Sequence, residues 1–205
     1  GGSVETGQRV TGLELSGKRV RGVRVGGAVL AADRVVIAAG VHSRRLLRPY
    51  GIALPVQPAK GYSVTIDASG LAGTPRIPVL DDTLHAGVTP LAKRLRLVGT
   101  AEFAGYDTRV DPVRIDNLFD MLKALFPAVE AGLDRQSAIP WAGLRPMSAD
   151  GKPLIGATTL EGLYVNAGHG HLGWTMAAGS AELLADLMQG ARPAIDPDAF
   201  ALAGR

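Results

Sequence analysis

The sequence predicts a mixed α/β fold, in which a layered α/β unit is interrupted by an inserted, largely antiparallel sheet. Continuous apolar runs followed by helical patterns stand near the two ends of the chain, at residues 33–51 and 163–190. Hairpin patterns fill the middle, and no internal repeat or low-complexity linker separates the parts. We therefore predict one discontinuous unit, residues 1–48 with 148–205, and an inserted sheet with one helix, residues 49–147.

Short strands are expected at the N-terminal end, over residues 8–15, 18–25 and 28–31. Gly17 separates the first two, which predicts a hairpin. Residues 33–40, DRVVIAAG, hold five consecutive apolar residues and predict a strand that is buried on both faces, as in a parallel sheet. A short helix follows, which we expect to be capped by His42 and Ser43 and to stop by Gly51.

The middle of the chain combines strands with one well-marked helix. Residues 54–66 are expected to hold a Pro-rich turn and then a strand, and residues 84–91 and 95–103 two more strands that form a hairpin. Residues 111–126 predict the helix, because Asp111 is a good N-cap and Pro112 suits the first helical position. Its predicted core face is Val113, Ile115, Leu118, Phe119, Leu122, Leu125 and Phe126. Pro127 ends the helix, and residues 137–147 predict a strand broken by prolines.

The C-terminal end carries a strand, residues 163–167, and a long helix over about 174–189, joined by GHGHLG at residues 168–173. Read literally, this is the G-x-G-x-x-G pattern between a strand and a helix. A dinucleotide-binding fingerprint also needs a second parallel strand after the helix, and only a short tail follows Gly190. The residues alone leave two interpretations open: a helix start that faces a ligand, or a tight turn held by its histidines.

Composition narrows the class of protein. The chain has 205 residues, 46% hydrophobic and 20% charged, with a formal net charge of +3, which is typical of a globular protein. Its densest basic run, KRVRGVR at 18–24, alternates with apolar residues and predicts the solvent face of a strand, so no nucleic-acid partner is expected. The absence of cysteine excludes disulfides and thiolate metal sites and is compatible with the cytoplasm. No apolar run approaches the ~20 residues of a membrane span.

Two specific stretches resemble a known family. Residues 141–156, WAGLRPMSADGKPLIG, and 164–187, YVNAGHGHLGWTMAAGSAELLADL, are similar to the C-terminal signature of the D-amino-acid oxidase-like flavoproteins, and most similar to its bacterial D-amino-acid dehydrogenase branch. PAKGYS from residue 58, GTAEFAGYD at 99–107 and VVIAAG at 35–40 also resemble that branch. The resemblance implies part of an FAD-binding, Rossmann-like layered domain with an inserted, mostly antiparallel substrate-binding sheet, and no metal.

The resemblance also implies what the chain leaves out. The family's own G-x-G-x-x-G loop and the acidic ribose-binding residue that follows it have no counterpart here. We therefore expect these 205 residues to correspond to about the C-terminal half of such an enzyme. A fragment of this extent is expected to bind FAD weakly and to be inactive alone.

Residue roles follow from the matching motifs. Arg145, in GLRP, would hold the substrate carboxylate through the planar fork of its guanidinium; the alternative is an Arg that pairs with Asp150 or Glu102 on a surface turn. The residues that would lie against the flavin are Gly168, His169, Gly170, Leu172, Gly173, Trp174 and Thr175. His171 is a candidate for proton transfer or for lining the site, although oxidation of a neutral amine needs no obligate protein base.

Three further positions complete the predicted site. Val10 matches the position whose backbone contacts the adenine end of FAD, and Ala39 and Gly40 would lie close to the cofactor. For Gly40 the alternative is an ordinary turn at the end of a strand. Tyr62 either offers its phenol to the substrate carboxylate or is a core or rim residue.

The function implied is oxidation of the CH–NH2 group of a D-amino acid by FAD, which yields a 2-oxo acid and ammonia, with a quinone or another carrier as electron acceptor. A glycine- or sarcosine-type amine oxidase of the same superfamily and an inactive folded module remain the alternatives. We expect a cytoplasmic location, and contact with the inner membrane face is implied by the resemblance alone.

Overall fold

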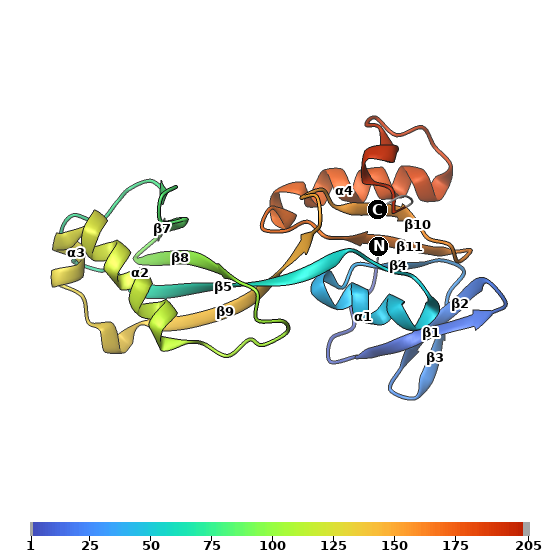
Figure 1. The fold of residues 1–205 in the computed structure, drawn as a ribbon, viewed down its shortest axis with the longest axis horizontal. Helices are drawn as coiled ribbons and strands as arrows, with labels where there is room; N and C mark the ends of the chain where they lie inside the picture. Colours follow the sequence, from blue (N-terminus) through green and yellow to red (C-terminus); the bar gives the residue numbers. More distant parts are fainter. Residues whose placement is uncertain (1, 203–205) are drawn as a thin grey trace. The chain divides into compact units, whose positions relative to one another are not determined.

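A computed structural model describes residues 2–202 of the chain (Figure 1). The chain divides into two compact units, residues 1–57 with 145–205 and residues 58–144. The unit boundaries thus fall at 57/58 and 144/145, whereas the sequence pattern led us to expect them at 48/49 and 147/148. No helix in the described part of the chain has the length and apolar character needed to cross a membrane.

The first unit begins with an antiparallel three-stranded sheet. Its strands are β1 (Val10–Ser16), β2 (Arg19–Val25) and β3 (Ala28–Ala31), in the order β1-β2-β3. Gly17 lies in the β1–β2 turn with φ +61°, a left-handed conformation that glycine adopts without strain. The predicted hairpin and third strand are confirmed.

A second small sheet pairs a strand from the N-terminal part of the chain with two strands from its C-terminal part. It has the order β10-β11-β4, formed by Leu154–Ala157, Leu163–Ala167 and Val35–Ile37. β4 and β11 are parallel, as expected. The prediction that β4 is buried on both faces is wrong, because the Val36 side chain is 37% exposed. The helix α4 (Gly173–Gln189) packs on β10 and β11 (Figure 1). β4 is the edge strand on the other side of β11 from β10.

The helices of the first unit are mostly short. η1 (Gly40–His42), α1 (Ser43–Leu47) and η2 (Arg48–Tyr50) follow β4, and η4 (Pro197–Phe200) follows α4. The expected side-chain cap of α1 is wrong: His42 occupies the N-cap position without a side-chain cap bond, and Ser43 is the buried first residue of the helix. Gly51 ends η2 in the left-handed conformation, as expected.

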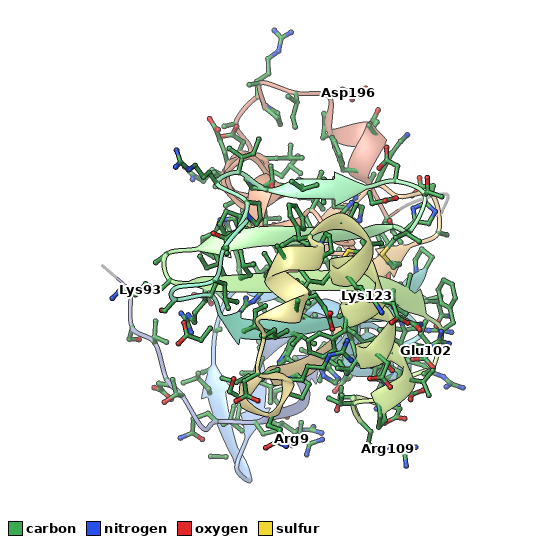
Figure 2. All side chains as sticks on the ribbon, turned by 90° about the vertical axis from the view of Figure 1, so that its left-hand side faces the viewer. Arg9, Lys93, Glu102, Arg109, Lys123 and Asp196 are labelled. Atoms are coloured by element: carbon green, nitrogen blue, oxygen red, sulfur yellow. The ribbon has the colours of Figure 1, made fainter. Side chains whose placement is uncertain are left out.

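The second unit is built on a five-stranded sheet of order β6-β7-β8-β5-β9. The strands are β5 (Val56–Asp67), β6 (Val79–Asp81), β7 (Ala86–Leu91), β8 (Arg94–Glu102) and β9 (Ile139–Ser148). Figure 2 shows Lys93 and Glu102 at opposite ends of β8. We expected prolines to break β9, but the strand is continuous. It is an edge strand, where Pro140 and Pro146 need not donate to a neighbour.

A helix covers one face of this sheet. α2 (Pro112–Leu125) is followed by α3 (Pro127–Ala131) and η3 (Arg135–Ser137). The Asp111 side chain accepts from the Val113 N–H at 3.0 Å, so the predicted N-cap is confirmed. The predicted core face is wrong at Val113, which is exposed in the first turn, and it omitted Met121, which is buried. The α2 residues in the core are Leu118, Phe119, Met121 and Leu122, packed against Tyr62, Val64 and Ile66 of β5.

Candidate functional site

The glycine-rich loop of the first unit lies beside the end of β9. Gly168 and Gly170 have φ +80° and +58°, and Gly173 begins α4. The Gly170 N–H donates to the Pro146 carbonyl at 2.9 Å, and His169 forms an isolated bridge with Met147. The loop is therefore bonded to the residues directly after Arg145, so that two motifs distant in the sequence meet.

The glycines of this loop are required by their surroundings. A Cβ on Gly168 would lie 3.3 Å from Val56 Cγ2, and one on Gly170 would lie 3.3 Å from the Met147 sulfur. These approaches are tighter than ordinary contacts, and the positive φ values add strain for any other residue. The loop therefore keeps its backbone close to its neighbours, and the helix that follows it, 17 residues long, carries partial positive charge at its first N–H groups.

The two histidines of the loop differ in environment. His169 Nε2 lies 2.9 Å from the hydroxyl of Ser180, which is about two turns into α4. Burial lowers the pKa of the His169 imidazole. His171 is exposed. His169 thus ties the loop to the helix, whereas the His171 imidazole is open to a ligand or to water.

The first turn of α4 is open. Trp174 is 96% exposed, and Leu172 and Thr175 are also exposed. Arg145 is half-buried, and burial lowers the pKa of its guanidinium from the ordinary value. An arginine remains charged even so. The loop region therefore offers a fixed cation, helix N–H groups and an uncovered apolar surface.

A separate pocket of the first unit holds two of the predicted cofactor residues. It has a volume of about 850 Å³ and is lined by Arg9, Val10, Thr11, Ala39, His42, Arg45, Leu46, Pro49 and Tyr50. Val10 of β1 and Ala39 after β4 thus meet in one pocket with two arginines. Gly40, next in the chain, has φ +53° with nothing within 4 Å of a built Cβ. The basic residues of this pocket were not predicted from the sequence.

Tyr62 belongs to the second unit, where it is 1% exposed in the core. Its hydroxyl donates to Glu102 Oε2 at 2.6 Å. Burial, and then this hydrogen bond, raise the pKa of the phenol. Of the two roles left open, the structure therefore matches the core residue, and the phenol already has a partner.

Sequence reasoning missed the neighbours of Tyr62. Lys60 Nζ lies 3.9 Å from both Glu102 Oε2 and Asp107 Oδ2, and its side chain is 3% exposed. A hydrogen bond to Tyr62 raises the pKa of Lys60, although burial opposes that shift. The stretch PAKGYS could have indicated this neighbourhood, because Lys60 and Tyr62 stand two residues apart on one strand and so lie on the same face. Among residues 2–202, no three His, Asp or Glu side chains are grouped to hold a metal ion.

Comparisons with known proteins identify the family of the chain. The family profile described as FAD dependent oxidoreductase (DAO) matches residues 1–187. A D-amino acid dehydrogenase of Paramagnetospirillum magneticum is 44% identical over 193 residues, which are 94% of this chain and 45% of that protein. The chain therefore spans about half the length of the curated relative it matches.

Solved structures give the same fold. Glycine oxidase from Geobacillus kaustophilus is 28% identical, with a TM-score of 0.83 over 97% of this chain and 52% of that one. L-proline dehydrogenase from P. horikoshii shares the fold with a TM-score of 0.83, at 21% identity over 95% of this chain and 53% of that one. The mixed α/β fold and the family expected from the motifs are confirmed, and the chain belongs to the DAO family of FAD-dependent oxidoreductases.

Proposed function

We propose that the protein oxidises the CH–NH2 group of D-amino acids, with FAD as cofactor. The observation that carries this proposal is the bond between Gly170 and Pro146, which joins the glycine-rich helix start to the strand end that bears Arg145. A helix start that favours negative charge, beside an arginine whose guanidinium can pair with a carboxylate, suits an amino-acid substrate and a flavin cofactor. The 44% identity to a D-amino acid dehydrogenase supports the same substrate class. Because the chain spans 45% of that relative, we assign the activity to the natural full-length chain.

The residues of the first unit fit the cofactor. Arg9 and Arg45 offer charge to the phosphates of FAD, while Val10 and Ala39 are small enough to admit it. Gly40 has open space beside it. The Gly168–Thr175 segment would hold the isoalloxazine ring, since Leu172, Trp174 and Thr175 are exposed and the helix start favours negative charge nearby. This assignment makes residues 1–57 and 145–205 the cofactor-binding unit and residues 58–144 the substrate-binding unit.

In the proposed reaction, bound FAD would be the acceptor of the two electrons. Arg145 binds the substrate carboxylate with two charge-assisted hydrogen bonds, which orients the α-carbon. His171 is the candidate to accept a proton from the substrate ammonium, because its ring is exposed while His169 is bonded to Ser180. Loss of two electrons and two protons converts the amine into an imine. Water then hydrolyses the imine to the 2-oxo acid and ammonia.

A second candidate keeps the fold and changes the substrate. The 28% identity and TM-score of 0.83 to a glycine oxidase favour a glycine- or sarcosine-type amine oxidase. The electron acceptor separates the two: the dehydrogenase passes electrons to a quinone or another carrier, at a peripheral membrane contact, and the oxidase passes them to oxygen.

The test is an anaerobic visible spectrum of the natural full-length chain with FAD, titrated with D-alanine and then with sarcosine. We expect bleaching of the flavin band near ~450 nm with D-alanine. The variant Arg145→Ala should lose the bleaching but keep the flavin, whereas Arg21→Ala, an exposed arginine on β2 of the same unit, should behave as wild type. Bleaching with sarcosine alone would support the oxidase, and a bound flavin that no amine bleaches would refute both.

A further inference from the structure

A tyrosine hydroxyl holds the edge strand of the three-stranded sheet in the first unit. β1 stands at one end of the order β1-β2-β3, so one of its edges faces away from the sheet. Tyr50, the last residue of η2, bonds to that strand at Leu13. The Leu13 N–H donates to the Tyr50 oxygen at 2.5 Å, and the Tyr50 O–H donates to the Leu13 carbonyl at 3.2 Å. A hydroxyl can donate and accept at once, so one phenol satisfies both backbone groups of one residue.

The neighbours of Tyr50 leave room for this contact. Gly12 is buried, and a Cβ built on it would lie 2.8 Å from the Tyr50 hydroxyl oxygen. Gly12 has no positive φ, so its backbone conformation does not require glycine. The close approach of the phenol is what requires it. The rest of the Tyr50 side chain packs against the core cluster that contains Leu13 and Leu47, so the side chain is held at both its ring and its hydroxyl.

The contact lies next to an irregular part of β1. Val10 pairs with Val25 and Gly12 with Arg24, so Thr11 is one residue more than β2 offers in that interval. A bulge of this kind interrupts the ladder of hydrogen bonds, and pairing with β2 therefore fixes this part of β1 less firmly than a regular ladder would. The two bonds from Tyr50, two residues beyond Thr11, hold the strand from its other edge.

The bulge and the tyrosine line the same pocket, the one of about 850 Å³. Val10 and Thr11 of β1 line it from one element, with Arg9 directly before them, and Arg45 of α1 lines it from another. Tyr50 follows α1 in the chain and bonds to β1, so its hydroxyl ties these two walls of the pocket together. A binding pocket with fixed walls pays less ordering entropy when its ligand enters.

We propose that Tyr50 is a positioning residue of the cofactor pocket, which holds β1 to η2 and so keeps the Val10–Thr11 bulge in place for the adenosine diphosphate half of FAD. The inference rests on the proposed function, in which Arg9 and Arg45 offer charge to the phosphates of FAD. It adds a residue that acts through β1, and it assigns the pocket to one half of the cofactor. The flavin ring, which we assign to the Gly168–Thr175 segment, should not respond to Tyr50.

The test measures binding of FAD to the apo form of the natural full-length chain by flavin fluorescence, with ADP as competitor. Tyr50→Phe should raise the Kd of FAD and the inhibition constant of ADP by the same factor, about tenfold, because two backbone groups of Leu13 lose their partner. At saturating FAD the visible spectrum of the bound flavin should match that of wild type, which a general loss of structure would not leave unchanged. Tyr164→Phe removes a partly buried phenol from β11, outside the pocket, and should change neither constant.

Gly12→Ala perturbs the same contact from the other side. Its Cβ would displace the Tyr50 hydroxyl, so it should weaken FAD and ADP as Tyr50→Phe does. The double variant should be no weaker than the weaker single variant, because the contact is already lost. Hydrogen exchange of the Leu13 amide gives a readout that needs no ligand. It should accelerate in Tyr50→Phe and in Gly12→Ala and stay unchanged in Tyr164→Phe.

Each measurement can overturn one step of the inference. Unchanged FAD affinity in Tyr50→Phe would overturn the positioning role, and equal weakening in Tyr164→Phe would do the same. A weaker FAD with an unchanged ADP constant would overturn the assignment of the pocket to that half of the cofactor. Additive losses in the double variant, or unchanged Leu13 exchange in Tyr50→Phe, would overturn the contact as its cause.

Failure of the proposed function gives a different result. If the natural chain binds FAD with the expected dependence on Tyr50 but oxidises no D-amino acid, the proposed activity is refuted and the role of Tyr50 is supported. If the natural chain binds neither FAD nor ADP, the cofactor assignment and the role of Tyr50 in it are both refuted.

Discussion

Gly162 is the position at which one methyl group should damage the first unit most clearly. It precedes β11 with φ +76°, and a Cβ built there would lie 2.8 Å from the Asp33 carbonyl oxygen and 3.0 Å from Val20 Cγ1. Its own carbonyl accepts from the Val35 N–H at 2.8 Å, which begins the parallel pairing of β4 with β11. Gly162→Ala therefore pushes against backbone that cannot rotate away.

Gly51→Ala is the matched control, because Gly51 has φ +74° and nothing within 4 Å of a built Cβ. The left-handed conformation alone should cost each variant about 1–2 kcal/mol. At Gly162 the Asp33 oxygen must also retreat by roughly half an ångström to reach ordinary contact. We estimate a further ~1–2 kcal/mol from the weakened Val35 hydrogen bond and the displaced packing. Gly162→Ala should thus lose about 2–4 kcal/mol in total, against about 1–2 kcal/mol for Gly51→Ala.

The assay is urea unfolding of the natural chain followed by far-ultraviolet circular dichroism, with hydrogen exchange of the Val35 amide as a local probe. Faster exchange at Val35 is expected in Gly162→Ala and not in Gly51→Ala. Equal losses of unfolding free energy in the two variants would refute the steric argument. So would an unchanged Val35 amide in a destabilised Gly162→Ala protein.

Three further predictions concern capping and charge. Asp111→Ala should cost about 1 kcal/mol of unfolding free energy through loss of the α2 N-cap, whereas Asp116→Ala, exposed within the helix, should cost little. Arg109 holds the pKa of Asp107 at about 2, so the stability from this carboxylate is present above its ordinary pKa and is lost as the pH falls through about 2. Arg109→Ala should move the pKa of Asp107 back toward the ordinary value in an NMR titration; an unmoved pKa would contradict the assignment. Burial lowers the pKa of His169, so stability should decline as the pH falls below the ordinary histidine pKa of about 6.5. His169→Asn should flatten that decline in unfolding experiments across this range, and an unchanged slope would assign it to another group.

Local chemistry accounts for the elements that were predicted well. Asp111 and Pro112 mark the start of α2, and Gly17 marks the β1–β2 turn, because each of these residues satisfies the backbone by itself. The glycine-rich loop and the Arg145 motif were also found, since both are contiguous stretches. That Gly170 bonds to Pro146 was not predictable, because it joins segments with no shared local pattern.

The errors have a common origin in neighbours that lie far away in sequence. Val36 is exposed because α4 covers β10 and β11 instead of β4, and Val113 is exposed because the buried face of α2 centres on Leu118, Phe119 and Leu122. β9 stays continuous through its prolines because it is an edge strand. In each case the pattern described one element correctly and could not say what would stand beside it.

By itself, the sequence determined the class of fold, the capped helix, the hairpins and the family, because these depend on short-range patterns and contiguous motifs. The different environments of His169 and His171, the basic pocket around Val10 and Ala39, and the pairing of buried Lys60 with Glu102 and Asp107 depend on tertiary structure. Burial, charge pairing and pocket shape are properties of residues brought together by folding. The spacing of Lys60 and Tyr62 puts both on one face of β5, but only the fold shows that this face is buried and that Glu102 of β8 pairs with the lysine.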